Sequence, residues 1–317
     1  MVGIFFRKIA AVAFYLICAA IIAASGFVFG IYGFGWDSRP AVWFSEIVPI
    51  PAASVNGRVI KIREINSIMG AYRFLVESGI NFDFASEAGG KQLASERDQV
   101  MKAAVENAVV REIFENKKLE VTPDEFRSYY AYLLNQAGIS SGAAPAEIAR
   151  KFGWSENDFI KYVAIPEYRR AKLDVFFLEN DSASPAYDKI TRAREQILMG
   201  KTFGEVAKAY SDDEKSKYIG GEIGLISTKN LDPWQSGALA KIGTQKLGGI
   251  VAAPGGYHIF QVTGRQAEEG GARLPAPEAA ADGGQEKLRL SHIFVQSDPL
   301  NSALRDALAD SKVYFFY

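Results

Sequence analysis

The spacing of hydrophobic positions changes along this 317-residue chain. An uncharged, mostly apolar run extends from Ile9 to Trp36. Short β-compatible runs follow on either side of Asn56-Gly57, a pair that favours a tight hairpin turn. Apolar residues then recur every three or four positions, as on one face of a helix: Ile65, Ile68, Tyr72 and Leu75, followed by Met101, Val105, Val109 and Ile113. The pattern predicts a hairpin followed by helices.

Two further helix starts are marked by capping residues. Thr122-Pro123-Asp124-Glu125 offers an N-cap, a proline at the first helical position and a capping-box glutamate. Ser155 with Asp158 is a weaker version of the same arrangement. A third helix is predicted from apolar positions that step by three or four residues: Ala164, Tyr168, Ala171, Val175 and Leu178.

The first apolar run has the length of a membrane span. Its 28 residues exceed the ~20 that cross a bilayer. Arg7 and Lys8 precede it and Asp37 follows, which places the N-terminus in the cytoplasm by the positive-inside rule. We therefore expect a single-pass anchor in the cell membrane and an extracytoplasmic body, in the periplasm or at the cell surface. A signal peptide cleaved near Ala23-Ala24-Ser25 is the alternative.

Composition narrows the possible functions. With 48% hydrophobic and 23% charged residues, the chain is long enough to form two domains with separate cores. A net charge of -1, without a dense Lys/Arg run, gives no reason to expect nucleic acid as a partner. Because Cys18 is the only cysteine, no intrachain disulfide can form.

Four motifs follow one another between Phe203 and Arg265. They are a Phe203-led helix, Ser211-Asp212-Asp213, Gly220-Gly221-Glu222-Ile223-Gly224, and Gly256-Tyr257-His258-Ile259 after an intervening pocket segment. In this order and spacing, over about 60 residues, they resemble a parvulin-type peptidyl-prolyl isomerase. The resemblance implies a small antiparallel sheet with surrounding helices.

The histidine-bearing strand that opens a parvulin, of the type SHILV, is absent upstream of these motifs. Leu290 to Val295, LSHIFV, matches that strand but follows the GYHI motif. The simplest account is a permuted domain whose first strand arrives from the C-terminal side, across the Gly/Pro/Ala/Glu-rich segment 265–287. Two alternatives remain: Leu173 to Leu178 as a degenerate first strand with Val175 in place of histidine, or LSHIFV as the remnant of a second, truncated parvulin.

The chain on either side of the parvulin motifs also resembles a known group. The hairpin, the amphipathic helices, VTPDEF and GWSENDF together resemble the chaperone domain of SurA/PpiD-type periplasmic folding factors. In that family the helices form an apolar cradle for unfolded clients. Asp298 and Pro299 begin a further helix. By the same resemblance, we expect Lys312 to Tyr317 to return and pair near Val55 to Ile60.

The predicted fold is therefore a mixed α+β chain in several parts. These are a cytoplasmic stub and anchor (1–36), a helical chaperone domain (52–180 with 297–317), a parvulin-type domain (184–264 with 288–296) and a flexible linker (265–287). The implied clients are unfolded or nascent exported polypeptides with X-Pro bonds, and the implied membrane contact is one N-terminal helix.

The parvulin resemblance also implies site residues. His258 and His292 correspond to the paired histidines and Asp213 to the polar catalytic position, without a cofactor or metal. The implied prolyl pocket consists of Leu231, Trp234, Leu239 and Ile223. The implied function is an isomerase and chaperone that assists exported proteins at X-Pro bonds. The alternative is a non-catalytic holdase that uses an inactive parvulin fold to bind peptides.

Overall fold

The computed structural model describes residues 22–31, 39–79, 82–244, 246–267 and 286–316. They divide into two compact units. Unit 1 comprises Met1–Val109 with Asp310–Tyr317, and unit 2 comprises Val110–Ala309. The boundary between them falls inside the long helix α4, Glu87–Asn116. The domain boundaries expected from the sequence stay a prediction about which parts fold independently.

The predicted membrane-spanning helix is wrong. Among the described residues, no helix is both long and apolar enough to cross a bilayer. Of the predicted span, residues 22–31 are described and are helical. The rest of the predicted span, 9–21 and 32–36, lies outside the described residues. The fold class is thus corrected to helices and strands with a small antiparallel sheet. The predicted membrane localisation is also wrong, because it rested on the membrane-spanning helix.

Besides the helical residues 22–31, the described part of unit 1 contains a small sheet and three helices. Its elements are α2 (Arg39–Ile47), β1 (Pro51–Val55), β2 (Arg58–Lys61), α3 (Ile62–Gly79), most of α4, and β7 (Val313–Phe315). The strand order is β2-β1-β7, with antiparallel pairing throughout. Asn56 and Gly57 turn the β1-β2 hairpin with φ of 50° and 84°, the left-handed conformation that Asn-Gly pairs favour. The hairpin predicted at this position is confirmed.

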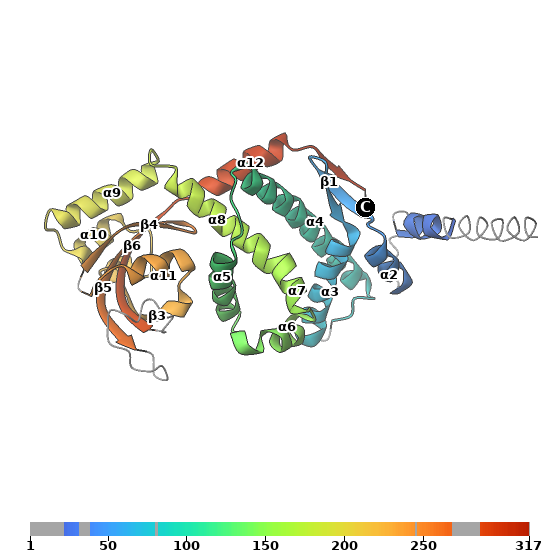
Figure 1. Ribbon diagram of the computed structural model, residues 1–317, viewed down its shortest axis with the longest axis horizontal. Coiled ribbons are helices and arrows are strands. Elements are labelled where there is room, and N and C mark those ends of the chain that lie inside the picture. Colours follow the sequence, from blue (N-terminus) through green and yellow to red (C-terminus); the bar gives the residue numbers. More distant parts are fainter. Residues whose placement is uncertain (1–21, 32–38, 80–81, 245, 268–285, 317) are drawn as a thin grey trace, which may run out of the picture. The chain divides into compact units, whose positions relative to one another are not determined.

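The last strand of unit 1 comes from the far end of the sequence (Figure 1). In β7, Val313 and Phe315 pair with Val55 and Ala53 of β1. The backbone N–H of Asn56 donates to the Lys312 carbonyl at 3.0 Å, and the Asn56 side chain accepts from the Lys312 N–H at 2.9 Å. The expected return of the C-terminal residues to the hairpin is confirmed.

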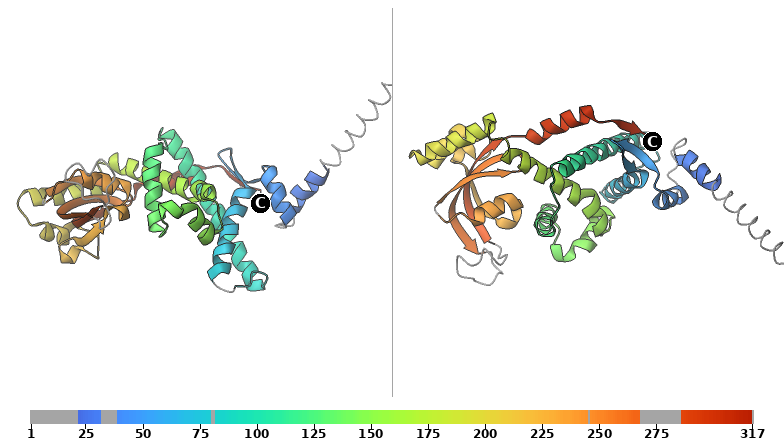
Figure 2. Two further views of the ribbon diagram at one scale, coloured as in Figure 1. Left: turned by 60° about the horizontal axis from the view of Figure 1, so that its bottom comes forward. Right: turned by 45° about the horizontal axis from the view of Figure 1, so that its top comes forward.

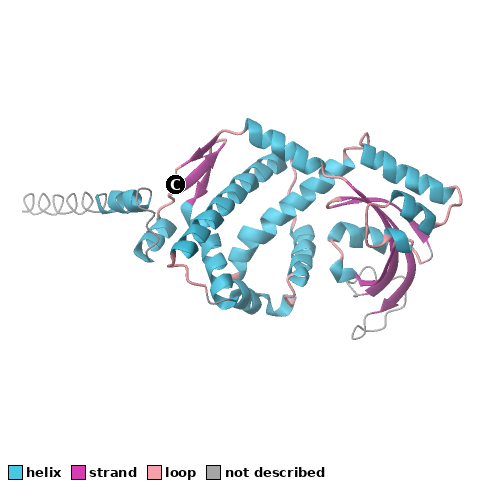
Figure 3. Ribbon diagram, turned by 180° about the vertical axis from the view of Figure 1, so that it is seen from behind, coloured by secondary structure: helices cyan, strands magenta, loops and turns pink. Residues whose placement is uncertain are grey.

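Unit 2 begins with helices. They are α5 (Pro123–Gln136), α6 (Ala144–Phe152), α7 (Glu156–Phe159), α8 (Ile165–Glu179), α9 (Pro185–Leu198) and α10 (Phe203–Tyr210), with a 3₁₀ turn η1 (Ser141–Ala143) and a π-helical turn η2 (Ile160–Ala164). Ser155 forms a complete capping box with Asp158 at the start of α7. Leu173 to Leu178 lies within α8, so the degenerate-strand alternative is wrong (Figure 3).

A four-stranded antiparallel sheet completes unit 2 (Figure 3). Its strands are β3 (Glu222–Ser227), β4 (Lys246–Ala253), β5 (Gly256–Ala267) and β6 (Glu286–Gln296), in the order β3-β6-β5-β4. The turns η3 (Lys217–Ile219) and η4 (Thr228–Asn230) flank β3, α11 (Pro233–Ala240) precedes β4, and α12 (Pro299–Asp310) follows β6. The segment LSHIFV is thus a central strand, as the permutation predicts.

Helices lie on both sides of this sheet (Figure 2), and the side chains beneath them form two separate cores. On one face, Ile259 of β5 and Ile293 of β6 pack with Val206 of α10 and Ile190 of α9. On the other face, a cluster around α11 contains Leu239, Phe260, Val262, Leu288 and Leu290. Leu288 and Leu290 therefore face away from Ile293, which is the alternation expected of a strand.

The expected linker between β5 and β6 is shorter than predicted at both ends. Strand β5 continues to Ala267 and β6 begins at Glu286, and these two residues are paired. Arg265 forms an ion pair with Glu286 and donates to the Leu239 carbonyl at 2.9 Å. Residues 268–285 lie outside the described residues.

Candidate functional site

The two histidines of the sequence meet on one face of the sheet in unit 2. Phe260 of β5 is paired with His292 of β6, and His258 is paired with Phe294. This register makes His258 and His292 diagonal neighbours, and their ring centroids lie 5.9 Å apart. The predicted proximity of the two histidines, within ~10 Å, is confirmed.

His258 is enclosed by aromatic rings. Its ring stacks on Phe260 with centroids 5.3 Å apart and lies tilted against the Phe294 ring at 4.8 Å. The side chain is only 6% exposed, and neither ring nitrogen has a hydrogen-bond partner among the described residues. Burial, and next the nearby charge of His292, lower the pKa of His258 to about 3. At neutral pH this imidazole is uncharged and has unused hydrogen-bonding capacity.

Asp213 supplies the charge of the site. Its Oδ2 atom lies 2.9 Å from Nε2 of His292 and accepts a hydrogen bond from the Ser216 hydroxyl. Burial acts to raise the pKa of Asp213, but hydrogen bonds from Ser216, His292 and the Lys215 N–H lower it to about 2. The carboxylate is therefore ionised at neutral pH and fixes the orientation of the His292 ring.

The Ser211-Asp212-Asp213 motif attaches this carboxylate to β6. Ser211 Oγ accepts from the Phe294 N–H at 3.1 Å, and the Asp212 N–H donates to the Phe294 carbonyl at 2.7 Å. The Asp212 carboxylate accepts from the Gln296 N–H at 3.1 Å. The motif thus occupies the edge of β6 beyond the end of its pairing with β3. The sequence singled out Asp213 but not the roles of Ser211 and Ser216. The available signal was that both hydroxyls lie within three residues of Asp213 in the sequence.

Gly221 forms the other attachment of β6. Its carbonyl accepts from the His292 N–H at 2.8 Å, and its φ is 76°, in the left-handed region. A Cβ atom at this position would lie 2.5 Å from the His292 carbonyl oxygen. Since a backbone atom cannot move aside cheaply, the second glycine of the GG motif is required for the approach of this turn to β6.

Gly221→Ala is expected to lower the free energy of unfolding of unit 2 by about 2 kcal/mol, because it adds backbone strain to the clash. Chemical denaturation of the full chain would measure this loss. Gly237→Ala in α11 is the matched control, since no atom lies within 4 Å of its added Cβ. Equal stabilities of the two variants would contradict the role assigned to Gly221.

The predicted pocket residues do not all pack together. Leu231, Leu239 and Ile223 belong to the cluster that contains Phe260, below the histidines. Leu239 is fully buried, whereas Leu231 and Ile223 are partly exposed. Trp234 packs in a different cluster, in edge-to-face contact with Tyr129 of α5 at 5.9 Å. The structure therefore brings three of the four residues together and places Trp234 against a helix.

The assembled site combines a carboxylate–histidine pair, a buried neutral histidine and an adjacent apolar surface. In the described part of the chain, no cluster of three or more His, Cys, Asp or Glu residues could hold a metal ion. The chemistry available to these side chains is hydrogen bonding and electrostatic stabilisation of a bound group. The catalytic and substrate-binding roles given to individual residues stay predictions.

Comparison with known proteins agrees with the geometry. Residues 172–264 match the model of the rotamase family, the PPIC-type PPIASE domain. A 72-residue segment is 38% identical to chaperone SurA of Alkalilimnicola ehrlichii, covering 23% of this chain and 17% of the relative. Another 72-residue match is 33% identical to foldase protein PrsA 1 of Bacillus cereus and covers 23% and 25% of the two chains. The chain thus matches a quarter or less of these relatives' own length.

A solved structure from Campylobacter jejuni, described in terms of two structurally related SurA-like chaperones, aligns over 84% of this chain and 98% of its own. The identity is 12% and the TM-score 0.26. The matched family range ends at Gly264, so both β6 and His292 lie outside it. The family match over residues 172–264 supports a PPIC-type domain in this chain, and the strand pairing shows how β6 completes the sheet.

Proposed function

We propose that this chain is a peptidyl-prolyl cis-trans isomerase of the parvulin type that assists the folding of exported polypeptides at X-Pro bonds. The observation that carries the proposal is that His258, His292 and Asp213 meet on one face of the sheet in unit 2. Strand β6, which carries His292, lies outside the matched family range. Three separate segments of the sequence, which contain Asp213, His258 and His292, are thus brought together by the fold.

The reaction needs only differential binding. Partial double-bond character gives the X-Pro amide a rotation barrier of ~18–20 kcal/mol, and the twisted amide loses that resonance. A site that binds the twisted form better than either planar form lowers the barrier without a covalent step. Neutral His258 shapes the buried floor of the site beside His292, Asp213 and His292 set the local polarity, and Leu231 and Ile223 provide apolar contact for the ring.

The experimental test is Asp213→Ala in the full chain. Loss of the carboxylate leaves His292 without its fixed partner, so we expect at least a tenfold lower rate of prolyl exchange, about 1.4 kcal/mol in barrier. Magnetisation exchange on a short peptide with one Ala-Pro bond measures that rate. Suppression of client aggregation should change little.

The control for this test is Asp124→Ala, which removes an exposed carboxylate of α5 that pairs with Arg127 at 3.0 Å. Parent-like exchange is expected for that variant. An equal loss of exchange and of aggregation suppression in Asp213→Ala would indicate one shared binding surface. A parent protein that does not accelerate exchange would select the holdase alternative.

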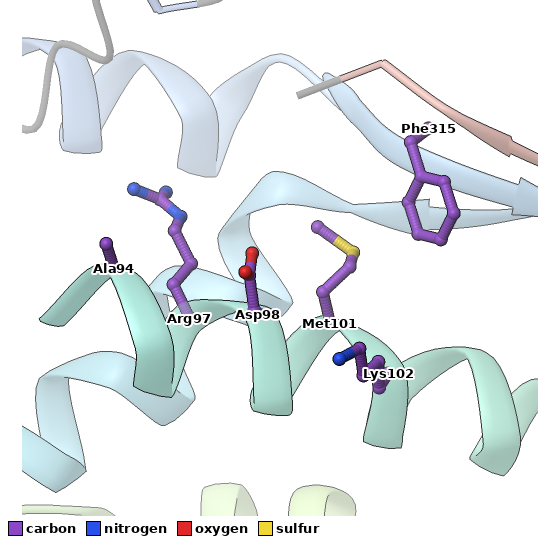
Figure 4. A pocket seen from close by; sticks show the side chains of 6 residues that line it. All are labelled: Ala94, Arg97, Asp98, Met101, Lys102 and Phe315. Atoms are coloured by element: carbon purple, nitrogen blue, oxygen red, sulfur yellow. The ribbon is translucent and has the colours of Figure 1, made fainter. Parts of the chain in front are cut away.

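The holdase alternative is favoured by a feature of unit 1. A hollow of about 440 Å³ is lined by Met101, Arg97 and other residues of α4 and by Phe315 of β7 (Figure 4). Tyr314 and Phe315 are 58% and 59% exposed on this strand. Exposed aromatic side chains on a strand with a free edge suit an extended apolar polypeptide, which could add to the sheet as a further strand. Under this alternative, binding of unfolded clients would be the whole function.

A further inference from the structure

Helix α5 lies outside the matched family range, yet it contacts the segment that carries the predicted pocket residues. The Asn135 amide donates to the Lys229 carbonyl at 3.1 Å and to Oδ1 of Asn230 at 2.8 Å. The Gln136 amide donates to the Asn230 carbonyl at 3.3 Å. The C-terminal end of α5 is thereby attached to the turn η4, which leads directly into α11.

An aromatic contact adds to these hydrogen bonds. The ring of Tyr129, 6% exposed, meets the Trp234 ring edge to face at 5.9 Å. Tyr129 is itself held by Tyr168 of α8, with ring centroids 5.5 Å apart. Trp234 is therefore anchored on helices that precede the sheet in sequence.

The pocket segment is consequently held from two sides. Leu231 and Leu239 pack against the sheet around Phe260, while Trp234 packs against α5. Asp232 caps α11 by accepting from the Gln235 N–H at 2.8 Å, which fixes the direction in which the helix leaves η4. Without α5, η4 would lose these three hydrogen bonds and Trp234 of α11 would lose its contact with Tyr129.

We propose that Asn135, Gln136 and Tyr129 are positioning residues for the prolyl pocket, holding η4 and α11 where Leu231 can contact a proline ring. This inference rests on the proposed function. If α5 already holds η4 and α11 in place, these segments need not become ordered when the peptide binds, so the affinity for the peptide is higher than in a variant that lacks this attachment. Because His258, His292 and Asp213 are attached to the sheet, releasing α5 should weaken binding while leaving the catalytic groups in place.

The test is the full-chain double variant Asn135→Ala with Gln136→Ala. Titration of a tetrapeptide with one Ala-Pro bond, followed by its NMR shifts, should show about a tenfold higher Kd, equivalent to about 1.4 kcal/mol. Prolyl exchange at saturating peptide should stay within twofold of the parent, which separates binding from the barrier. Amide hydrogen exchange should become faster in residues 228–240, without added peptide.

Matched variants make the result specific. Arg127→Ala removes an exposed ion pair on the same helix without touching η4, and it should keep the parent Kd. Tyr129→Leu removes the ring that meets Trp234, so its Kd should rise as in the double variant. Asn135→Asp keeps the side-chain size but loses the amide donor, so the Kd of this variant should rise. If the double variant does not fold, Asn135→Asp replaces it in the test.

Two results would overturn the inference: an unchanged Kd in folded double and Asn135→Asp variants, or the same rise in Arg127→Ala. If the parent protein binds the peptide without accelerating prolyl exchange, the proposed isomerase activity is wrong. The positioning role would then still be tested by the change in Kd. If the parent does not bind the peptide, the proposed function fails, and unchanged hydrogen exchange in 228–240 would defeat the positioning role as well.

Discussion

Deletion of residues 286–317 is expected to leave the four-stranded sheet of unit 2 unfolded. The deletion removes the central strand β6, including Leu288, Leu290, Ile293 and Val295, each at most 1% exposed. Burial of four such side chains contributes about 6–12 kcal/mol, which is comparable with the whole stability of about 5–15 kcal/mol of an ordinary domain. Amide hydrogen exchange in β4 and β5 should rise to the rate of an unfolded chain.

The matched control for this truncation is deletion of residues 311–317. It removes β7 from the sheet of unit 1 and leaves β6 intact. Protection in β4 and β5 should then persist, while the hydrogen bonds that β1 makes with β7 are lost. Slow exchange in β4 and β5 of the longer truncation would show that β6 is dispensable, against its central position.

The stability of unit 2 should fall as the pH is lowered from 6.5 towards 3, because of His258. In the unfolded chain this histidine binds a proton below about pH 6.5, whereas in the folded state its pKa is about 3. Its stabilising effect is therefore complete above pH 6.5 and is lost as the pH falls through the folded value. Between pH 6.5 and pH 4 the expected loss is roughly 3 kcal/mol, at 1.36 kcal/mol per pH unit.

Denaturation of the parent and of His258→Leu across this pH range measures the effect. The leucine variant cannot take up the proton, so its stability curve should be flatter over the same interval. Other buried acids titrate in both proteins, and the difference between the two curves removes their contribution. Parallel curves would mean that His258 is charged, or reached by water, in the folded protein.

Local patterns predicted much of unit 2 from the sequence. The strand at Leu290 to Val295 was predicted from its match to the missing first strand of a parvulin, and its residues face the two cores alternately, as they do along any β-strand. The position of β6 beside β5 followed from the parvulin resemblance: the histidine-bearing strand that usually opens the domain was missing upstream, and LSHIFV was the segment that matched it. The capping box at Ser155 was likewise readable from spacing alone.

Other features depend on packing that no local pattern encodes. Thr122 has the residues of a capping box, but its hydroxyl contacts the Glu125 carboxylate instead of a backbone N–H. Trp234 was predicted in the pocket, yet it lies against Tyr129, a contact between residues far apart in sequence. The N-terminal apolar run met a criterion of length and composition alone, whereas no helix among the described residues is long and apolar enough to cross a membrane.

The order of strands also has a consequence for synthesis of the chain. Strands β3, β4 and β5 are made before β6, but β3 has no neighbour in the sheet until β6 pairs with it. In unit 1, the β1-β2 hairpin similarly waits for β7. A growing chain that has reached only Ala267 therefore exposes strand edges and apolar faces that later residues will cover. Each sheet is therefore completed only once its last strand, β7 in unit 1 or β6 in unit 2, has been synthesised.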